Sequence, residues 1–411
     1  MRTMRPQNWT ADGDWPGTVH TENRATVLAE LGSVLFASLP RRDQRRKGVE
    51  YVQGLLGVKG RKSIRNISSL FGGESAEQSL HHFISGSTWD WAPVRRALAR
   101  HMEEISPTRA HVLRPLVIPK AGDSSVGVDR RFCALRGQIM NAQQAVGVWA
   151  VSDESSTPVN WRLHLPDAWL EDEMRRRQAS IPDTALPETL DQCAVEAYIG
   201  ITKGWGLPTR PVVMDAREAD LARTVRRLSA AGAPMLLRIG PGERLTVTDP
   251  GLPRIRPGLT AYQIMTVARP LRHPVIQQAS GRSDASRTGL AACVRVEMPA
   301  GPGSARRPAR EMVLLGIGES GGRWPAELWL SDIAGAHPAQ LLRLARLTRQ
   351  VDRDYAQIAE EVGISDFSGR SFSGWHRHAT LASAAHAVEV LSGTAGSTLV
   401  ATHDQEARAT A

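Results

Sequence analysis

The middle of the chain alternates short apolar segments with helical ones, and this alternation constrains the fold more than any other feature. The strand-like apolar runs are residues 111–119, 143–152, 159–166, 210–215 and 234–240. Helical patterns occupy residues 168–180 and 219–232 between them. Strands that alternate with helices in this way indicate an α/β core around a mixed sheet. We therefore predict such a core, with helices flanking the sheet.

The segments around this core differ from it in composition and periodicity. Residues 24–106 have helical spacing and many basic side chains, whereas residues 241–335 are strand-like and punctuated by proline and glycine. The predicted division is a loose arm at 1–23, a helical domain at 24–106, the first part of the core at 107–240, a β-rich insertion at 241–335, the C-terminal core helices at 336–393 and a disordered tail at 394–411.

The charge of the chain indicates a polyanionic partner. The formal net charge is +9 at pH 7 and the pI is about 10.0, which is the electrostatic pattern of nucleic-acid binding. A dense basic cluster lies in the helical region, at Arg41, Arg42, Arg45, Arg46 and Lys47. We predict that this cluster contacts DNA. The alternative interpretation is a solvated basic surface with no such partner.

Several classes of protein are disfavoured by the sequence. The three cysteines, Cys133, Cys193 and Cys293, are far apart, so neither a disulfide framework nor a structural zinc site is indicated. No run of eighteen or more apolar residues and no apolar leader occurs, so we expect a cytoplasmic protein without a membrane partner. P-loop, dinucleotide-binding, serine hydrolase and zinc protease motifs are missing.

Two carboxylates are candidate metal ligands. Asp215 follows an apolar strand and precedes a helical segment, at the rim of the sheet where α/β sites form. The other interpretation makes it an N-cap, a role that Asp220 could equally fill. In the helical pattern of residues 338–362, Glu360 faces solvent, whereas Glu361 lies on the flank of the apolar stripe and is the better candidate.

A polar stretch follows this helix at residues 366–381. The side chains predicted to contact phosphates or bases are Arg370, Trp375, His376, Arg377 and His378. Trp375 could equally anchor the core. The two histidines lack further ligands at a fitting distance, so we reject a zinc site.

Four segments in order, residues 119–152, 157–169, 210–220 and 353–381, resemble the DDE-type insertion-sequence transposases of bacteria. The resemblance covers about residues 25–390. It implies an RNase H-like fold and two divalent metals, usually Mg²⁺ or else Mn²⁺, held by two aspartates and a glutamate. Asp215 matches the second aspartate, Glu361 the glutamate and Lys120 a lysine of the first motif. We place Arg130 and Arg131, in the basic segment after Lys120, with the DNA-binding residues.

The first acidic motif departs from the family pattern. Its two aspartate positions fall on Arg114 and Pro115, and an arginine there replaces a negative charge by a positive one. Asp123 and Asp129 lie nearby, but beyond the turn that follows the strand. Two carboxylates and an arginine provide too little charge to hold two Mg²⁺ ions against their mutual repulsion.

These observations predict a DNA-binding protein of the transposase family that lacks, or is impaired in, strand cleavage and transfer. The expected partner is double-stranded DNA, including terminal inverted repeats, in the nucleoid, and the expected oligomer is a homodimer. Two alternatives stay open. One is an active transposase with Mg²⁺ or Mn²⁺, and the other is a domesticated fold with a regulatory or small-molecule role.

Overall fold

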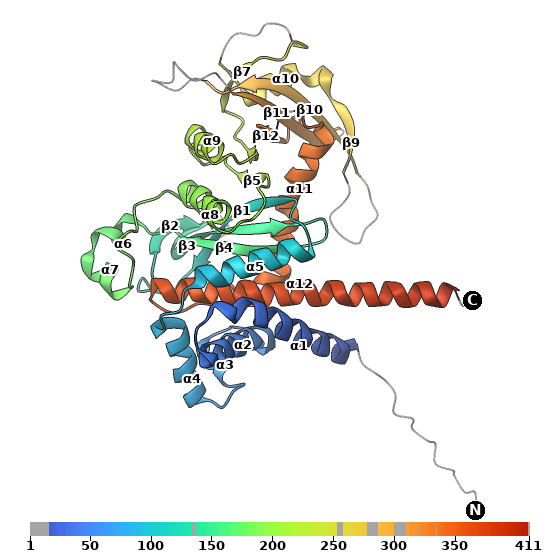
Figure 1. The fold of residues 1–411 in the computed structure, drawn as a ribbon. Helices are drawn as coiled ribbons and strands as arrows, with labels where there is room; N and C mark the ends of the chain where they lie inside the picture. Colours follow the sequence, from blue (N-terminus) through green and yellow to red (C-terminus); the bar gives the residue numbers. More distant parts are fainter. Residues whose placement is uncertain are drawn as a thin grey trace, which may run out of the picture.

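The structure, a computed structural model, describes residues 16–133, 137–252, 258–277, 287–299, 310–319, 321–333 and 335–409. Figure 1 shows N-terminal helices at one end, a sheet flanked by helices in the middle and a strand-rich part at the other end. The predicted α/β fold is confirmed: a mixed sheet is flanked by helices and carries a β-rich insertion and an N-terminal helical domain.

Helices make up the N-terminal region. They are α1 (Pro16–Leu35), η1 (Phe36–Ser38), α2 (Arg42–Gly57), α3 (Ile64–Ser68), α4 (Glu74–His81), η2 (His82–Gly86) and α5 (Trp91–Ile105). The start of α5 follows from its sequence, because the Asp90 side chain accepts a hydrogen bond from the Ala92 N–H and Pro93 lies in the first turn. Since α1 begins at Pro16, part of the segment predicted as a loose arm is helical.

Among the described residues after α5, one mixed sheet of 12 strands runs through the molecule. Its central path, in spatial order, is β2 (Val128–Cys133), β3 (Gln138–Val151), β1 (Ala110–Pro119), β5 (Val212–Asp215), β6 (Met235–Arg238), β12 (Glu327–Ser331), β11 (Glu311–Glu319), β10 (Arg287–Glu297), β7 (Arg244–Val247) and β8 (Leu259–Thr260). Off this path, β4 (Ser156–Leu163) pairs with β3, and β9 (His273–Gln277) pairs with β10. The parallel pairs are β1–β5 and β5–β6.

The strands β1 and β5 have helices on both faces. Val112 and Val213 belong to the core that contains α11 (Pro338–Asp354) and α12 (Phe372–Ala409). Leu113 and Met214 belong to a second core, with α8 (Leu190–Gly204) and α9 (Leu221–Ala230). Successive side chains of a strand point to opposite faces. The side chains of β1 and β5 therefore alternate between the layer of α11 and α12 and the layer of α8 and α9.

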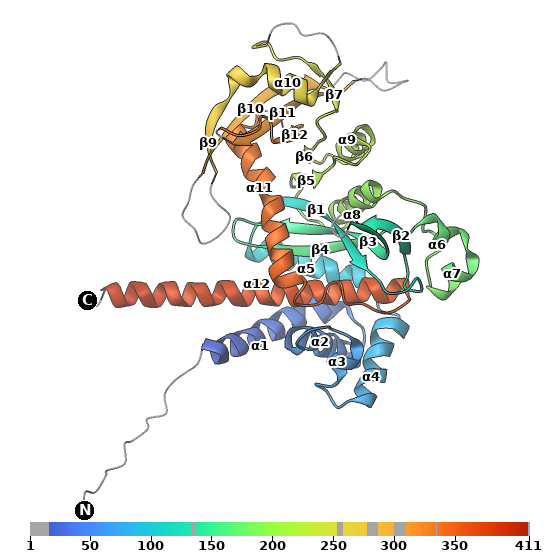
Figure 2. The same ribbon diagram turned by 180° about the vertical axis from the view of Figure 1, so that it is seen from behind.

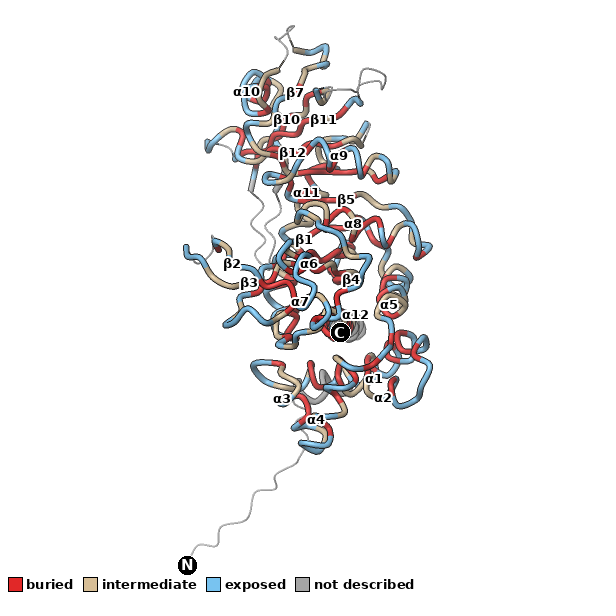
Figure 3. Tube along the Cα trace, turned by 90° about the vertical axis from the view of Figure 1, so that its left-hand side faces the viewer, coloured by how far each residue is buried: buried red, intermediate tan, exposed pale blue. Residues whose placement is uncertain are grey.

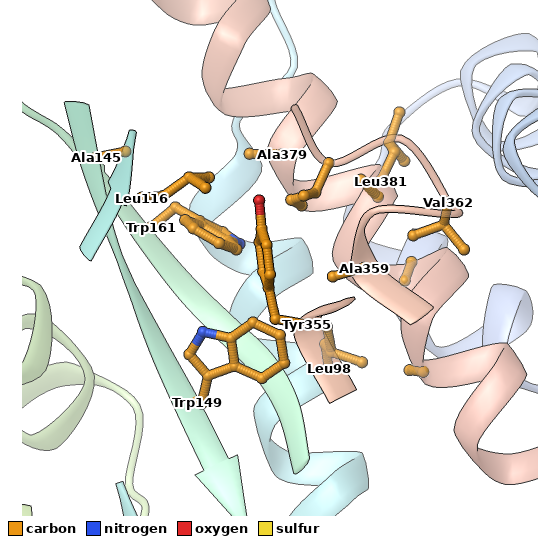
Figure 4. Packing of buried hydrophobic residues seen from close by; sticks show 14 of the residues in the cluster. Leu98, Leu116, Ala145, Trp149, Trp161, Tyr355, Ala359, Val362, Ala379 and Leu381 are labelled. Carbon is orange, nitrogen blue, oxygen red and sulfur yellow. The ribbon is translucent and has the colours of Figure 1, made fainter. Parts of the chain in front are cut away.

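Aromatic rings fill the first of these cores. Figure 4 shows Trp149 and Trp161 of the sheet facing Tyr355, which begins the short π-helix η4 (Tyr355–Ala359) after α11. The Trp149 ring lies edge-on to the other two, with 6.4 Å between ring centroids in each pair. Figure 2 shows α11 crossing the same face of the sheet. This packing fixes the C-terminal end of α11 against the strands.

Helix α12 joins the N-terminal helices to the sheet. It packs against α1, α2 and α5 on one side and β4 on the other, and it continues past Gly393, where a disordered tail was predicted, to Ala409. Buried Arg95 of α5 ties this junction together, because its guanidinium donates to Thr380 Oγ1, Asn160 Oδ1 and the carbonyl oxygens of Trp161 and His376. In Figure 3 the buried residues follow the strands and the facing sides of these helices.

The predicted β-rich insertion is joined edge to edge with the core sheet. Strand β12 pairs antiparallel with β6, and α10 (Ala261–Val267) and η3 (Arg269–Leu271) lie within the insertion. Most of the predicted loop tip at 301–310 lies outside the described residues. Two short helices, α6 (Asp167–Glu171) and α7 (Glu173–Gln178), follow β4. Over the described ranges, none of the helices has both the length and the apolar character needed to span a bilayer.

Candidate active site

The register of the parallel strands determines which side chains meet at their carboxyl ends. Leu113 of β1 pairs with Met214 of β5, so the next residues, Arg114 and Asp215, lie level with one another. The register of β6 adds Arg238 opposite Asp215. Because Leu113 and Met214 face the α8–α9 core, Arg114 and Asp215 face the other layer, toward α11. Three charged side chains thus lie in a row across neighbouring strands: Arg114 on β1, Asp215 on β5 and Arg238 on β6.

A cavity of about 750 Å³ lies over this row. Its walls come from β1, β5, β6, β12, α8, α9 and α11, and its volume is in the usual range for ligand pockets. The charged side chains that line it are Arg114, Asp191, Asp215, Arg217, Glu218, Asp220, Arg223, Arg238 and Asp352. Acidic and basic groups are thus nearly balanced at the carboxyl ends of the parallel strands, the place where sites form in α/β sheets.

Asp215 is neutralised by an arginine of its own loop. Arg217 donates from Nε to Asp215 Oδ1 at 2.8 Å and from Nη2 to Oδ2 at 2.6 Å, and its backbone N–H donates to Oδ1 at 3.2 Å. Partial burial acts to raise the pKa of Asp215, but the hydrogen bonds and charge of Arg217, with the charge of Arg238, outweigh it and lower the pKa. Asp215 is not an N-cap, since Asp220 caps α9 by accepting from the Arg223 N–H.

A second carboxylate reaches the cavity from α11. Arg114 Nε donates to Asp352 Oδ1 at 2.9 Å. The Arg114 guanidinium also lies 3.7 Å from the centroid of the Tyr355 ring, an attractive cation–π arrangement. The Arg114 guanidinium is therefore held by the face of the Tyr355 ring and by the Asp352 carboxylate.

The structure brings Asp352, and not Glu361, to the cavity beside Asp215. Glu361 is exposed in the turn after η4, and it is not among the residues that line the cavity. The prediction of Glu361 assumed one regular helix to residue 362, whereas α11 ends at Asp354 and a π-helix follows, which changes the angle between successive side chains. Thr348 and Asp352 are one turn apart on α11 and both line the cavity, but no local feature of the sequence distinguishes Asp352 from other exposed carboxylates of the helix.

Comparison with known families decides the relationship of the chain. A model of the family described as DDE superfamily endonuclease matches residues 34–287, more than half of the 411 residues. The chain belongs to this family. The resemblance predicted from the four segments is thereby confirmed at the level of the family. The match contains β1 and β5, and so Arg114 and Asp215, and it ends before α11. No match is found among curated proteins.

DDE superfamily endonucleases typically use divalent metals, but the side chains of this cavity do not suit them. Both oxygens of Asp215 accept hydrogen bonds from Arg217, and Asp352 is paired with Arg114. Mg²⁺ requires several oxygen ligands in near-octahedral geometry. Within the described ranges, no group of three or more His, Cys, Asp or Glu side chains is arranged to hold a metal ion. The residues present do not fit a pair of divalent cations.

The basic cluster predicted at the start of α2 lies on the surface of this DDE-family protein. Arg41, Arg42, Arg45 and Arg46 are exposed, whereas Lys47 is half-buried and bonds Glu50 at 2.7 Å. Arg45 donates to the Leu39 carbonyl, and Arg46 lies 3.4 Å from Glu50. Four arginines on one short stretch thus present guanidinium groups to solvent.

The other basic residues predicted to contact DNA differ in how far they are exposed to solvent. Lys120 is half-buried, and its Nζ donates to the Phe367 carbonyl at 2.5 Å. Burial, with the charge of Arg61, lowers the pKa of Lys120 to about 8, against an opposing effect of Asp366. Arg130 and Arg370 are exposed, and Arg131 lies 3.6 Å from Asp129. Lys120 therefore links the loop after β1 to the segment that precedes α12.

The predicted DNA contacts at Trp375, His376, Arg377 and His378 are wrong, because all four side chains are buried. They lie in the first turns of α12, which is covered on both sides. Arg377 donates to the carbonyls of Trp89 and Ile84, and His378 bonds the Tyr51 hydroxyl and the Gly363 carbonyl. Trp375 belongs to the hydrophobic core, as the alternative interpretation had it. These polar side chains join the N-terminal helices to the core.

Proposed function

We propose that this DDE-family protein binds double-stranded DNA and does not cleave or transfer its strands. One observation carries the second half of the proposal. Arg114 occupies the strand position level with Asp215, and it forms an ion pair with Asp352, the carboxylate that α11 supplies. The position from which a third carboxylate would act thus holds a cation.

Electrostatics explains why this change opposes metal-dependent cleavage. Two divalent ions a few ångströms apart repel strongly, and only several carboxylates can offset that repulsion. Here Arg114 and Arg217 neutralise the two carboxylates, and Arg238 adds a further positive charge 3.9 Å from Asp215. The two carboxylates nearest the family's expected metal position, Asp215 and Asp352, thus have their charge offset by arginines.

The binding half of the proposal rests on the exposed arginines at the start of α2. Arginine forks suit phosphate geometry, and the excess of positive charge on the chain favours association with a polyanion. Family membership supports DNA as the partner. Terminal inverted repeats are the expected sequences, since the four segments resemble insertion-sequence transposases.

A variant in which four arginines are replaced together by glutamine is expected to bind duplex DNA more weakly, and its affinity should depend less on salt concentration. The four are Arg41, Arg42, Arg45 and Arg46. Removing one phosphate-binding arginine lowers the slope of log affinity against log salt by about 0.9, so the slope should become shallower by about 3 to 4. Fluorescence anisotropy with a labelled duplex across a salt series measures both quantities.

The control removes a second arginine cluster. Arg175, Arg176 and Arg177 of α7 lie beside Asp172 and Glu173, and their replacement by glutamine should change the slope by less than one. If the α2 variant binds with the wild-type affinity and slope, α2 is not the DNA surface. If the wild-type chain does not bind duplex DNA at all, the proposed function is wrong.

A further inference from the structure

A second, smaller cavity lies between the helices α8 and α9, and we call it the α8–α9 pocket. Its volume is about 350 Å³, at the lower end of the range for ligand pockets. The loop before α8 and one face of each helix line it. It shares Asp191, Gln192 and Arg223 with the larger cavity and therefore adjoins it. The pocket has room for a small molecule.

Two of the acidic side chains in this pocket already have cationic partners. Glu196 of α8 accepts from Arg227 of α9, and this bond ties the two helices together. Glu188 accepts from Arg162 Nε at 2.6 Å and from its Nη2 at 2.7 Å. The charges of these four side chains therefore offset one another.

One acid and one base of the pocket lack an ionic partner among the described residues. Asp191 of α8 is half-buried and accepts from the Thr189 hydroxyl, a neutral group that leaves its charge uncompensated. Arg223 of α9 is exposed, and its guanidinium is paired neither with Asp191 nor with another described carboxylate. The pocket thus presents one free negative charge and one free positive charge, on opposite helices.

The register of the two helices shows what lies opposite Arg223. Both helices begin at the larger cavity, so they run in the same direction. The bond between Glu196 and Arg227 joins residues 31 apart in the chain. The same offset, one turn nearer the start of both helices, places Arg223 opposite Gln192, the neighbour of Asp191. Arg227 thus has a carboxylate opposite it, whereas Arg223 has only a neutral amide.

A buried hydroxyl of the pocket is also unpartnered. The Thr224 side chain lines the pocket and is only 2% exposed, and its Oγ1 has no hydrogen-bond partner among the described residues. An unpaired buried polar group costs stability. Thr224 directly follows Arg223 and lines the same pocket, so a carboxylate bound between them accepts hydrogen bonds from both.

Apolar side chains line the wall on the side of α8. Val195 of the helix is buried, whereas Leu186, in the loop before it, is 72% exposed. Pro187 lies next to Leu186 and is also exposed. An apolar group placed against this wall would remove its surface from water, which is favourable.

We propose that the α8–α9 pocket binds an apolar α-amino acid. Its carboxylate binds Arg223 and the Thr224 hydroxyl, its ammonium group binds Asp191, and its side chain packs on Leu186 and Val195. Charge-assisted hydrogen bonds of this kind are the strong ones. A zwitterion satisfies both free charges, whereas a ligand with a single charge would leave one of them unpaired. The inference is separate from the DNA-binding proposal, because the arginines at the start of α2 take no part in it.

Calorimetry with the full-length chain tests this inference. The probes are L-leucine, 4-methylpentanoate, which lacks the ammonium group, 3-methylbutylamine, which lacks the carboxylate, and glycine, which lacks the side chain. We expect L-leucine to bind with a dissociation constant of about 1 mM or lower. Each of the other three should bind at least about tenfold more weakly, for want of a charge-assisted bond or of apolar contact.

Variants identify the contacts. Arg223→Gln and Asp191→Asn should each weaken L-leucine about tenfold. Arg223→Gln should leave the affinity for 3-methylbutylamine unchanged, since that probe has no carboxylate, and Arg223→Lys should restore part of the affinity for L-leucine. Thr224→Val, which removes the hydroxyl at nearly constant volume, should weaken L-leucine severalfold. Arg226→Gln is the control, because Arg226 is exposed on the same helix and does not line the pocket.

Three results would overturn the inference. They are no binding of L-leucine at millimolar concentration, singly charged analogues that bind as tightly as L-leucine, and equal losses in Arg223→Gln and Arg226→Gln. Thermal unfolding gives a second readout: L-leucine should raise the midpoint of the wild-type chain and leave that of Arg223→Gln unchanged. Because no DNA is present, these results do not depend on whether the chain binds a duplex.

Discussion

An Arg114→Asp variant is expected to bind Mn²⁺, whereas the wild-type chain is expected not to bind it. The substitution places a third carboxylate level with Asp215 and releases Asp352 from its ion pair. The new carboxylate and the released Asp352 supply oxygen ligands of the kind that hard divalent cations need, although Asp215 stays paired with Arg217. At a metal concentration about 100 times the dissociation constant, binding should raise the free energy of unfolding by about 2.7 kcal/mol. Without metal, the variant should be less stable than wild type, since the acidic groups then repel.

Thermal or denaturant unfolding with and without Mn²⁺ measures this gain. Arg109→Asp is the matched control, because Arg109 is exposed, pairs with Asp153 and does not line the cavity. The double variant Arg114→Asp, Arg217→Ala should gain more than the single one, since it also releases Asp215. A gain in Arg109→Asp equal to that in Arg114→Asp, or no gain in the double variant, would contradict the assigned arrangement of carboxylates.

The free energy of unfolding is expected to fall steeply as the pH is lowered from about 6.5 toward 4. Burial, the largest cause in each case, lowers the pKa of His111 and His378 to about 4 and that of His386 to about 3. In the unfolded chain these histidines bind protons near pH 6.5. The unfolded state therefore binds more protons in this window, and stability is lost by about 1.4 kcal/mol per pH unit for each histidine.

His378 shows why protonation is unfavourable. Its Nε2 lies 2.9 Å from the Gly363 carbonyl, which can only accept, so this nitrogen carries the proton. Its Nδ1 therefore accepts from the Tyr51 hydroxyl, 2.9 Å away. Adding a proton at Nδ1 would place a positive charge in the buried junction between α2 and α12, where water cannot solvate it.

Denaturant unfolding at several pH values measures the slope, and variants assign it. His386→Leu should remove about one quarter of the pH dependence, because His386, packed against the Trp149 ring, is one of four buried histidines whose pKa is lowered by burial, with His111, His376 and His378. His81→Leu, which removes an exposed imidazole, is the control and should leave the slope unchanged. A stability that is flat between about pH 7 and pH 5 would show that these histidines are not buried in neutral form.

The elements that could be predicted from the sequence are those whose signals are local. The apolar run at 111–119 becomes β1, and Asp215 lies at the end of β5 where the strand pattern put it. Register then follows from burial: hydrophobic alternation turns Arg114 and Asp215 to one face. The assignment of the first acidic motif to Arg114 and Pro115 rests on the family resemblance and stays a prediction; the structure adds that Arg114 lies level with Asp215.

The parts that could not be predicted depend on contacts between distant segments. Nothing local marks the change from α11 to a π-helix at Tyr355, and that change separates Asp352 from Glu361. The polar residues at the start of α12 resemble a surface, yet the N-terminal helices and β4 cover them. Their burial follows from partners such as Trp89 and Tyr51, which are nearly 300 residues or more away in the chain.

Strand cleavage by the wild-type chain tests the central claim most directly. Purified protein is incubated in Mg²⁺ or Mn²⁺ with supercoiled DNA that contains the sequences flanking its gene, where terminal inverted repeats are expected. Nicked and linear products are then measured. We predict DNA binding with no metal-dependent nicking above the level of an Asp215→Ala control. Metal-dependent nicking by wild type that Asp215→Ala abolishes would contradict the account.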